Sequence, residues 1–286
     1  MQQVLMETLD FTINFFEENN IRYYACGGTC LGAVRHKSFI PWDDDVDLFV
    51  PYEDCVKLLE LKDRLDGTGY YIVTPETRGY YLPFPKICKC DTTIWERYDY
   101  PFVMGVYIDV FPLYLTNIDD YKDINKLHKS FLKAAERFQF ANQNYPFWRF
   151  VDNVRHFHLR GFLRNIKWKY DSFNVEKFRD TYKKIESSLN VVDGTKYVSY
   201  TSDKYSTEVL NKDWFDDYCE MPFGNLMIRL PQNYDAYLTY IYGDYMKLPP
   251  ENERISVHGK YYINFKEGLT LNEVRKRISK GEKCVL

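Results

Sequence analysis

The sequence lacks long apolar runs, paired cysteine motifs and an excess of positive charge. No stretch reaches the roughly 18 consecutive apolar residues of a membrane-spanning helix, which argues against an integral membrane protein. The seven cysteines include no CxxC pair, and the opening MQQVLMETLD lacks the basic and apolar regions of a signal peptide. We therefore expect a cytoplasmic protein with reduced thiols. A formal net charge of −3 argues against nucleic acid as a partner.

The period of the apolar residues changes along the chain and predicts its organisation. Residues 1–116 alternate between helical and strand-like runs, which predicts a core built on a mixed sheet. Residues 117–286 are mostly helical, with a β-hairpin that turns at Gly224 and Asn225. In this second region we expect helices near 119–143, 147–169 and 173–189. The expected fold class is α+β, and the second region should pack on the core and complete one active site.

Four aspartates crowd into FIPWDDDVDLFV, directly before an apolar run. Like charges this close raise each other's pKa unless a cation neutralises them. Alternate residues of a strand point the same way, so Asp45 and Asp47 can bind one Mg²⁺ through hard oxygen ligands, with Asp43 as a further ligand. A solvated acidic loop remains an alternative. A calcium-binding loop is disfavoured because Leu48 stands where that loop needs glycine.

A glycine turn lies upstream of these acids. Gly27, Gly28 and Thr29 end a predicted strand and begin a predicted helix, a geometry that offers backbone N–H groups to phosphate. Downstream, Asp109 is an isolated charge in the apolar stretch GVYIDVFPLY. A buried lone carboxylate is costly unless it is paired or binds metal, although a hydrogen-bonded structural aspartate would also satisfy it. A glycine turn, two acids on a strand and a third acid on a later strand resemble the nucleotidyltransferase superfamily.

The stretch GGTCLGAVRHKSFIPWDDDVDLFVPYED resembles the signature of the LicD family, the phosphocholine transferases related to fukutin. Three further stretches are similar to that family: KICKCDTT, YIDVFPLY and YGDYMKLPPENERISVH. This sequence departs from the usual pattern at Cys30, Ser38 and Val46. None of these departures removes an acid, so we do not expect an inactive relative.

The resemblance implies a nucleotidyltransferase-like core and a transferase activity. Phosphocholine would pass from CDP-choline to a sugar hydroxyl of a cell-surface glycan precursor, such as teichoic acid, capsule or lipooligosaccharide, and CMP would be released. The cofactor would be Mg²⁺ or Mn²⁺. Two alternatives stay open. One is a related transferase that uses another CDP-alcohol (ribitol or glycerol) or a nucleoside triphosphate. The other is a catalytically silent module that binds nucleotide or glycan.

The resemblance also implies roles for individual residues. Asp45 and Asp47 would be the metal ligands, and Asp109 would complete the metal site or accept the proton of the acceptor hydroxyl. The residues expected to bind substrate are Gly27, Gly28, Thr29, Arg35, His36, Lys37, Trp42, Lys86, Arg254 and His258. The basic residues could equally form a solvated turn, His258 could be structural, and Trp42, Tyr98 and Tyr100 could pack in the core instead of binding a trimethylammonium group.

The segment 147–169 has no counterpart in these signatures. With one flanking residue at each end it reads PFWRFVDNVRHFHLRGFLRNIKWKY. Six basic residues against Asp152 give this segment a local charge near +5. As one helix, it would gather a polar strip consisting of Arg149, Asn153, His156, Arg160, Arg164 and Lys167. Such a helix can lie on an anionic membrane, close to a lipid-linked acceptor. The alternative is a helix buried against the core with its basic strip in water. The first interpretation places the protein at the inner face of the plasma membrane, as a peripheral protein.

Overall fold

The computed structural model describes residues 1–98, 100–118, 121–143, 147–199, 208–256 and 259–282. Its helices are α1 (Gln2–Glu18), α2 (Gly27–His36), α3 (Tyr52–Glu60), α4 (Tyr121–Asn142), α5 (Phe147–Arg155), α6 (Leu159–Asp171), α7 (Val175–Glu186), α8 (Tyr234–Tyr242) and α9 (Leu271–Ser279). Its strands are β1 (Tyr24–Ala25), β2 (Asp47–Pro51), β3 (Tyr70–Val73), β4 (Lys86–Lys89), β5 (Thr93–Trp95), β6 (Tyr107–Thr116), β7 (Lys196–Ser199), β8 (Glu208–Asn211), β9 (Tyr218–Phe223), β10 (Leu226–Pro231) and β11 (Tyr262–Asn264). Short 3₁₀ turns are η1 (Lys62–Leu65), η2 (Ser172–Asn174), η3 (Lys212–Phe215) and η4 (Glu251–Glu253).

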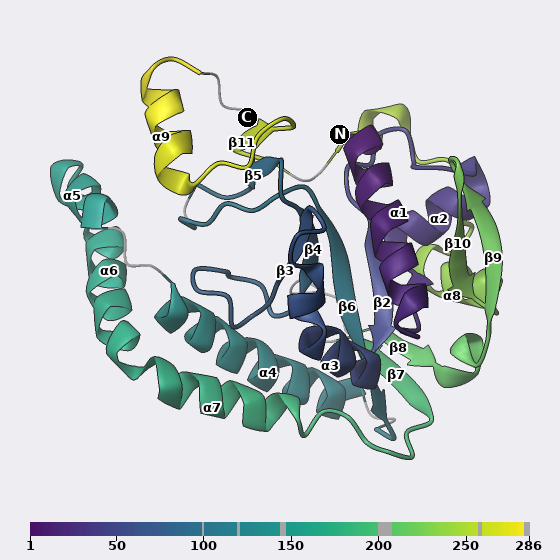
Figure 1. Cartoon of the computed structure of the whole chain (residues 1–286). Coiled ribbons are helices and arrows are strands. Elements are labelled where there is room, and N and C mark those ends of the chain that lie inside the picture. The colour runs from purple at the N-terminus through teal and green to yellow at the C-terminus, as the bar shows by residue number, and fades with distance from the viewer. Residues whose placement is uncertain (99, 119–120, 144–146, 200–207, 257–258, 283–286) are drawn as a thin grey trace.

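The centre of the fold is a mixed sheet in the order β1-β2-β6-β4-β3, to which β7 and β8 add beyond β6 (Figure 1). The pair β2 and β6 is parallel, and the other pairs in this sheet are antiparallel. β6 lies at the centre of the sheet because most of its residues are apolar, so both of its faces can be buried. The expected α+β class is confirmed.

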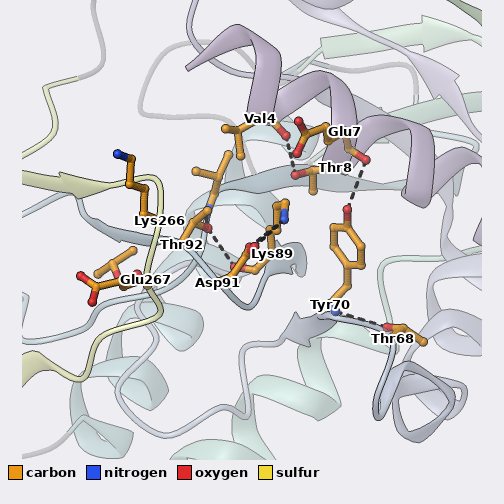
Figure 2. A network of polar contacts seen from close by, with 12 residues as sticks. Val4, Glu7, Thr8, Thr68, Tyr70, Lys89, Asp91, Thr92, Lys266 and Glu267 are labelled. Atoms are coloured by element: carbon orange, nitrogen blue, oxygen red, sulfur yellow. Dashed lines mark hydrogen bonds and ion pairs between the residues drawn. The ribbon is translucent and has the colours of Figure 1, made fainter.

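Helix α1 covers one face of this sheet, as its apolar spacing predicts. Leu5, Leu9 and Phe16 are buried on its inner side. Polar contacts then link the helix to the sheet edge: in Figure 2, the hydroxyl of Tyr70 on β3 donates to the carbonyl of Glu7 over 3.4 Å. Helix α1 thereby holds the edge of the sheet farthest from the acidic loop.

A smaller aromatic core joins the second region to β6. The rings of Phe138 on α4 and Tyr182 on α7 stack with centroids 5.5 Å apart. Tyr114 of β6 packs edge-on against Phe131 of α4 at 6.3 Å. The helices of the second region therefore have their own packed contact with the sheet. The strands β7 and β8 extend that same sheet.

The predicted hairpin is confirmed as β9 and β10, which turn at Gly224 and Asn225. Gly224 has a φ of 63°, a left-handed value that glycine adopts without steric cost. Its N–H donates to the carbonyl of Lys37 over 2.8 Å, and Phe223 packs on Phe39. The hairpin thus supports the loop that leads from α2 to the acids.

The prediction of one continuous helix over 147–169 is wrong. Helix α5 ends at Arg155 and α6 begins at Leu159, because Phe157 has a φ of 54° that breaks the helical path. The expected polar strip is therefore not continuous. In addition, β2 begins at Asp47, so Asp45 lies in the segment before the strand and not within it.

Candidate active site

Three neighbouring strands place Asp47, Asp109 and Lys86 in one row. Asp47 on β2 is the register partner of Asp109 on β6, and Asp109 is the register partner of Lys86 on β4. Residues paired across strands point to the same face of a sheet, so the three side chains lie side by side. Lys86 Nζ lies 2.6 Å from Asp109 Oδ1, and both residues are buried. The isolated acid of the sequence therefore has a lysine partner.

The N-terminus of α2 lies against the start of β2. Thr29 Oγ1 accepts the backbone N–H of Asp47 over 2.9 Å, and the N–H of Cys26 donates to the carbonyl of Asp47 over 3.1 Å. Gly27 has a φ of 51°, and its N–H donates to the hydroxyl of Tyr237 over 2.9 Å. These contacts fix the glycine turn beside the first acid of the row.

Gly28 allows Asp43 to approach the same helix end. A Cβ atom on Gly28 would lie 2.5 Å from Asp43 Oδ2, closer than real contacts of this kind. The partial positive charge at a helix N-terminus favours anions, carboxylate and phosphate alike. The acids and the glycine turn therefore meet at one place in the fold.

The remaining acids of the run lie in the loop before β2. One carboxylate oxygen each from Asp43, Asp44 and Asp45 can lie within 4.8 Å of the others. Asp44 forms an ion pair with Lys260, a buried lysine of the C-terminal segment. Lys260 was not predicted from the sequence. Its one signal there is its position directly after the family-like stretch that ends in ISVH.

The two acids of the row have raised pKa values. Burial raises the pKa of Asp47 well above its usual range, and the nearby carboxylates of Asp45, Asp109 and Asp43 raise it further, while Lys86 lowers it. Burial also raises the pKa of Asp109 to about 6, although Lys86 opposes this shift. Aspartate oxygens are the hard ligands that Mg²⁺ prefers, so this donor set fits the ion.

Lys86 is held by a second group of buried side chains that the sequence did not point to. Its Nζ lies 3.4 Å from the centroid of the Tyr107 ring. The hydroxyls of Tyr107 and Tyr81 both donate to the carboxylate of Glu96. Burial alone would raise the pKa of Glu96, but the charge of Lys86 and these two hydrogen bonds outweigh it, so the pKa is lowered. Glu96 is therefore a half-buried carboxylate whose charge favours the charged form of the lysine.

A pocket of about 420 Å³ opens next to the acidic loop. Trp42 lines this pocket and directly precedes Asp43 in the sequence. Its walls come from α2, from the loop before β2 and from the segment after α8: they are Leu31, Arg35, Ile40, Trp42, Tyr242, Asp244, Tyr245, Lys247, Leu248, Pro249, Pro250 and Glu253. Arg35 Nη1 donates to the carbonyl of Tyr245 over 2.8 Å. The guanidinium of Arg254 lies 5.8 Å from the Trp42 ring. Arg35, Trp42 and Arg254, far apart in the sequence, are thus brought together.

The other expected residues are placed as follows. His36 packs its ring edge-on against Trp42 at 6.3 Å, beside the pocket. Lys37 is exposed and ends α2 in a left-handed conformation, at the opposite end of the helix from Gly27. Tyr100 stacks on Tyr81, and Tyr98 packs between other aromatic rings. His258 lies outside the described residues.

Carboxylates, a helix N-terminus and a buried lysine therefore lie together on one face of the sheet. Comparison with known proteins shows the family to which the chain belongs. Residues 20–154 match the family described as LicD/FKTN/FKRP, nucleotidyltransferase domain. The chain is 26% identical to the lipopolysaccharide cholinephosphotransferase LicD of Haemophilus influenzae over 259 residues, which are 90% of this chain and 94% of that protein. The resemblance to the LicD family is therefore confirmed.

A human relative is similar over a shorter part. The chain is 30% identical to the ribitol 5-phosphate transferase FKRP of Homo sapiens over 159 residues, which are 54% of this chain and 30% of FKRP. The match to an uncharacterized protein of Rickettsia prowazekii is 37% identical over 68 residues, 24% of this chain and 26% of that protein. The relatives with assigned activities thus transfer different phosphorylated alcohols.

Proposed function

We propose that this protein transfers phosphocholine from CDP-choline to a sugar hydroxyl of a cell-surface glycan precursor and releases CMP. The observation that carries the proposal is the row of Asp47, Asp109 and Lys86 at the N-terminus of α2. The similarity to a lipopolysaccharide cholinephosphotransferase along nearly the whole chain supports phosphocholine as the transferred group. A nucleotidyltransferase-like core fits the same assignment.

The nucleotide half of the donor fits the pocket beside Trp42. The Trp42 ring offers a face for the cytosine base, and base–aromatic stacking contributes about 1–3 kcal/mol per base. The guanidinium of Arg35 uses Nη1 to hold the pocket wall and keeps further N–H donors for a phosphate oxygen. In this placement the diphosphate extends from the pocket past Asp43 to the turn at Gly27 and Gly28, whose backbone can approach phosphate closely.

In the transfer step, the acceptor hydroxyl oxygen bonds to the phosphorus of phosphocholine. The bond from that phosphorus to the bridging oxygen breaks, and CMP leaves with the bonding pair. Asp109 accepts the hydroxyl proton, and the ammonium of Lys86 keeps that carboxylate in place. Asp45 and Asp47 would hold a divalent cation, Mg²⁺ or Mn²⁺, with Asp43 as a further ligand. When bound, the ion would neutralise charge on the diphosphate.

Three other donors and one non-catalytic role compete with this proposal. The similarity to FKRP favours CDP-ribitol as the second candidate, and CDP-glycerol or a nucleoside triphosphate would need the same chemistry. A silent module would bind nucleotide without turnover.

The acceptor is expected to be a lipid-linked glycan at the inner face of the plasma membrane.

Release of CMP tests the proposal directly. The purified protein is incubated with CDP-choline, CDP-ribitol or CDP-glycerol, with Mg²⁺ or with EDTA, and CMP is quantified. We expect release from CDP-choline that requires Mg²⁺ and is lost in Asp47→Asn. The exposed Asp91 provides a matched control, so Asp91→Asn should keep full activity. Release from CDP-ribitol alone would transfer the proposal to that donor. Nucleotide binding without release from any CDP-alcohol would refute the proposal and leave the silent module or a nucleoside triphosphate donor.

A further inference from the structure

Helix α6 presents its apolar side outward. Leu159, Leu163, Ile166 and Tyr170 recur at the spacing of one helical face. Each of these four side chains is at least 48% exposed. A surface helix normally buries its apolar face, so an exposed apolar stripe of this length is unusual.

The side of α6 that faces the protein includes two buried polar side chains beside an aromatic one. Asn165 and Asp171 are each only 3% exposed. Trp168, between them in the sequence, packs its ring at a tilt against Phe140 of α4, with centroids 5.0 Å apart. Because the helix already buries this side against α4, simple packing on the core does not explain its apolar side. The sequence-level alternative of an apolar face buried in the core therefore does not hold for α6.

The apolar surface continues beyond this helix. Phe157, in the break before α6, is 94% exposed, and the rings of Phe150 on α5 and Phe162 on α6 contact at 5.2 Å, which joins the two helices. We call the whole set the arm surface: Phe147, Val154, Phe157, Leu159, Leu163, Ile166, Tyr170 and Phe173. These eight are among twenty exposed large hydrophobic residues in the described part of the chain, yet they span only residues 147–173, so the exposure is concentrated.

Basic side chains flank the arm surface. On α6, Arg160 and Lys167 lie to one side of the apolar stripe and Lys169 to the other, and all three are exposed. Lys169 Nζ lies over the exposed Phe173 ring, 5.1 Å from its centroid, so a cation directly borders the apolar side chains. In Figure 1, α5 and α6 form an edge of the molecule opposite the β9–β10 hairpin, so a flat surface can reach them.

An apolar surface flanked by cations fits an anionic bilayer better than a second copy of the chain. In a symmetric dimer, the cations that flank one arm surface would face the same cations of the other copy, which is unfavourable. An anionic bilayer supplies lipid chains for the aromatic and aliphatic residues and negative headgroups for the flanking cations. No helix among the described residues is long and apolar enough to cross a membrane, so the contact lies at the membrane surface.

We propose that the arm surface docks the protein on an anionic lipid bilayer, with its apolar side chains at the boundary between headgroups and acyl chains. This contact needs neither the nucleotide nor the acidic row. It would hold the proposed active site near a lipid-linked acceptor, but its test is independent of that activity.

The test is cosedimentation with vesicles of phosphatidylglycerol and phosphatidylcholine in equal parts, and with phosphatidylcholine alone. The full chain should bind the anionic vesicles much more strongly than the neutral ones. The double variant Leu163→Ser/Ile166→Ser should reduce binding at least about tenfold, because it removes two aliphatic side chains that docking would bury in the bilayer. Val192, 88% exposed and outside the arm surface, provides the control, so Val192→Ser should bind as the wild type does.

Charge is tested separately with two triple variants of equal charge change. Arg160→Glu/Arg164→Glu/Lys167→Glu should abolish binding, whereas reversal of three exposed lysines of α4 (Lys126→Glu/Lys129→Glu/Lys133→Glu) should leave most of it. Circular dichroism melting checks that every variant is folded.

Three outcomes would overturn the proposal. The first is no binding of the wild type to anionic vesicles, and the second is equal loss in both triple variants, which would indicate charge attraction without a defined face. The third is a dimer without lipid that the Leu163→Ser/Ile166→Ser variant dissociates, because the arm surface would then be an interface between copies.

Discussion

Replacement of Lys86 by methionine should destabilise the fold, because it leaves the carboxylate of Asp109 buried without its partner. The side chains of Lys86 and Asp109 are 2% and 10% exposed, and their charged atoms lie 2.6 Å apart. Removing one partner of a buried ion pair costs about 3–5 kcal/mol, since the remaining charge is uncompensated. We expect the free energy of unfolding of Lys86→Met to fall by about that amount.

A double variant tests whether the loss of stability comes from the pairing of Lys86 with Asp109. Lys86→Met/Asp109→Asn removes both charges, so it should be more stable than the sum of the single changes predicts, with a coupling free energy of about 2–3 kcal/mol. The same strand offers a control. Lys89 pairs with Asp91 at 2.7 Å, but the Asp91 side chain is 64% exposed, so the coupling of Lys89→Met with Asp91→Asn should stay below about 1 kcal/mol.

Urea unfolding followed by circular dichroism measures both cycles. EDTA is present throughout, so that metal binding does not contribute to the folded state. The slope of free energy against urea should be equal among the variants, which shows that the unfolded states are comparable. A coupling between Lys86 and Asp109 no larger than that of the surface pair would refute the buried ion pair and, with it, the row of three side chains.

Three further predictions concern single side chains. Asp45→Asn and Asp47→Asn should each reduce CMP release more than about tenfold while keeping or raising the free energy of unfolding without metal, since each relieves like-charge repulsion. Gly28→Ala should displace Asp43 and lower kcat/KM about tenfold, while the melting temperature shows little change. Burial raises the pKa of Glu186 despite hydrogen bonds from two tyrosines, so the folded state binds the extra proton and wild-type stability falls as pH rises above the unfolded value. Glu186→Gln should therefore gain stability over the wild type as pH rises, and urea titrations at acidic and neutral pH would show no such trend if the reasoning fails.

The parts of the site that sequence predicts are those close together along the chain. The glycine turn and the acids of the DDDVD run lie within about twenty residues, so strand and helix periodicity alone suggests that they meet. Asp109 was predicted because a charge in an apolar strand needs an explanation. The register that pairs Asp47 with Asp109 confirms that these acids share one sheet face.

Other parts depend on contacts that no local pattern encodes. Lys260 and Asp44 are 216 residues apart in the sequence, and a lysine in a polar segment reads as solvated until the fold buries it. No pattern in the neighbouring sequence predicts a role for Glu96, because its partners Tyr81 and Tyr107 come from different segments of the chain. The break at Phe157 was missed for a different reason: helical periodicity does not reveal a single left-handed residue that carries a large side chain.

The balance of charge around the site explains why donor and cation should bind together. Two buried lysines in the described part of the chain, Lys86 and Lys260, pair with one carboxylate each. The acids near the row and its loop are more numerous: Asp43, Asp44, Asp45, Asp47 and Asp109. Burial raises the pKa of Asp47, and Asp45, Asp109 and Asp43 raise it further; the acids together would repel the diphosphate of a CDP-alcohol that entered alone. A divalent cation removes both repulsions at once, whereas a further lysine would neutralise the acids permanently and leave no place for an exchangeable ion.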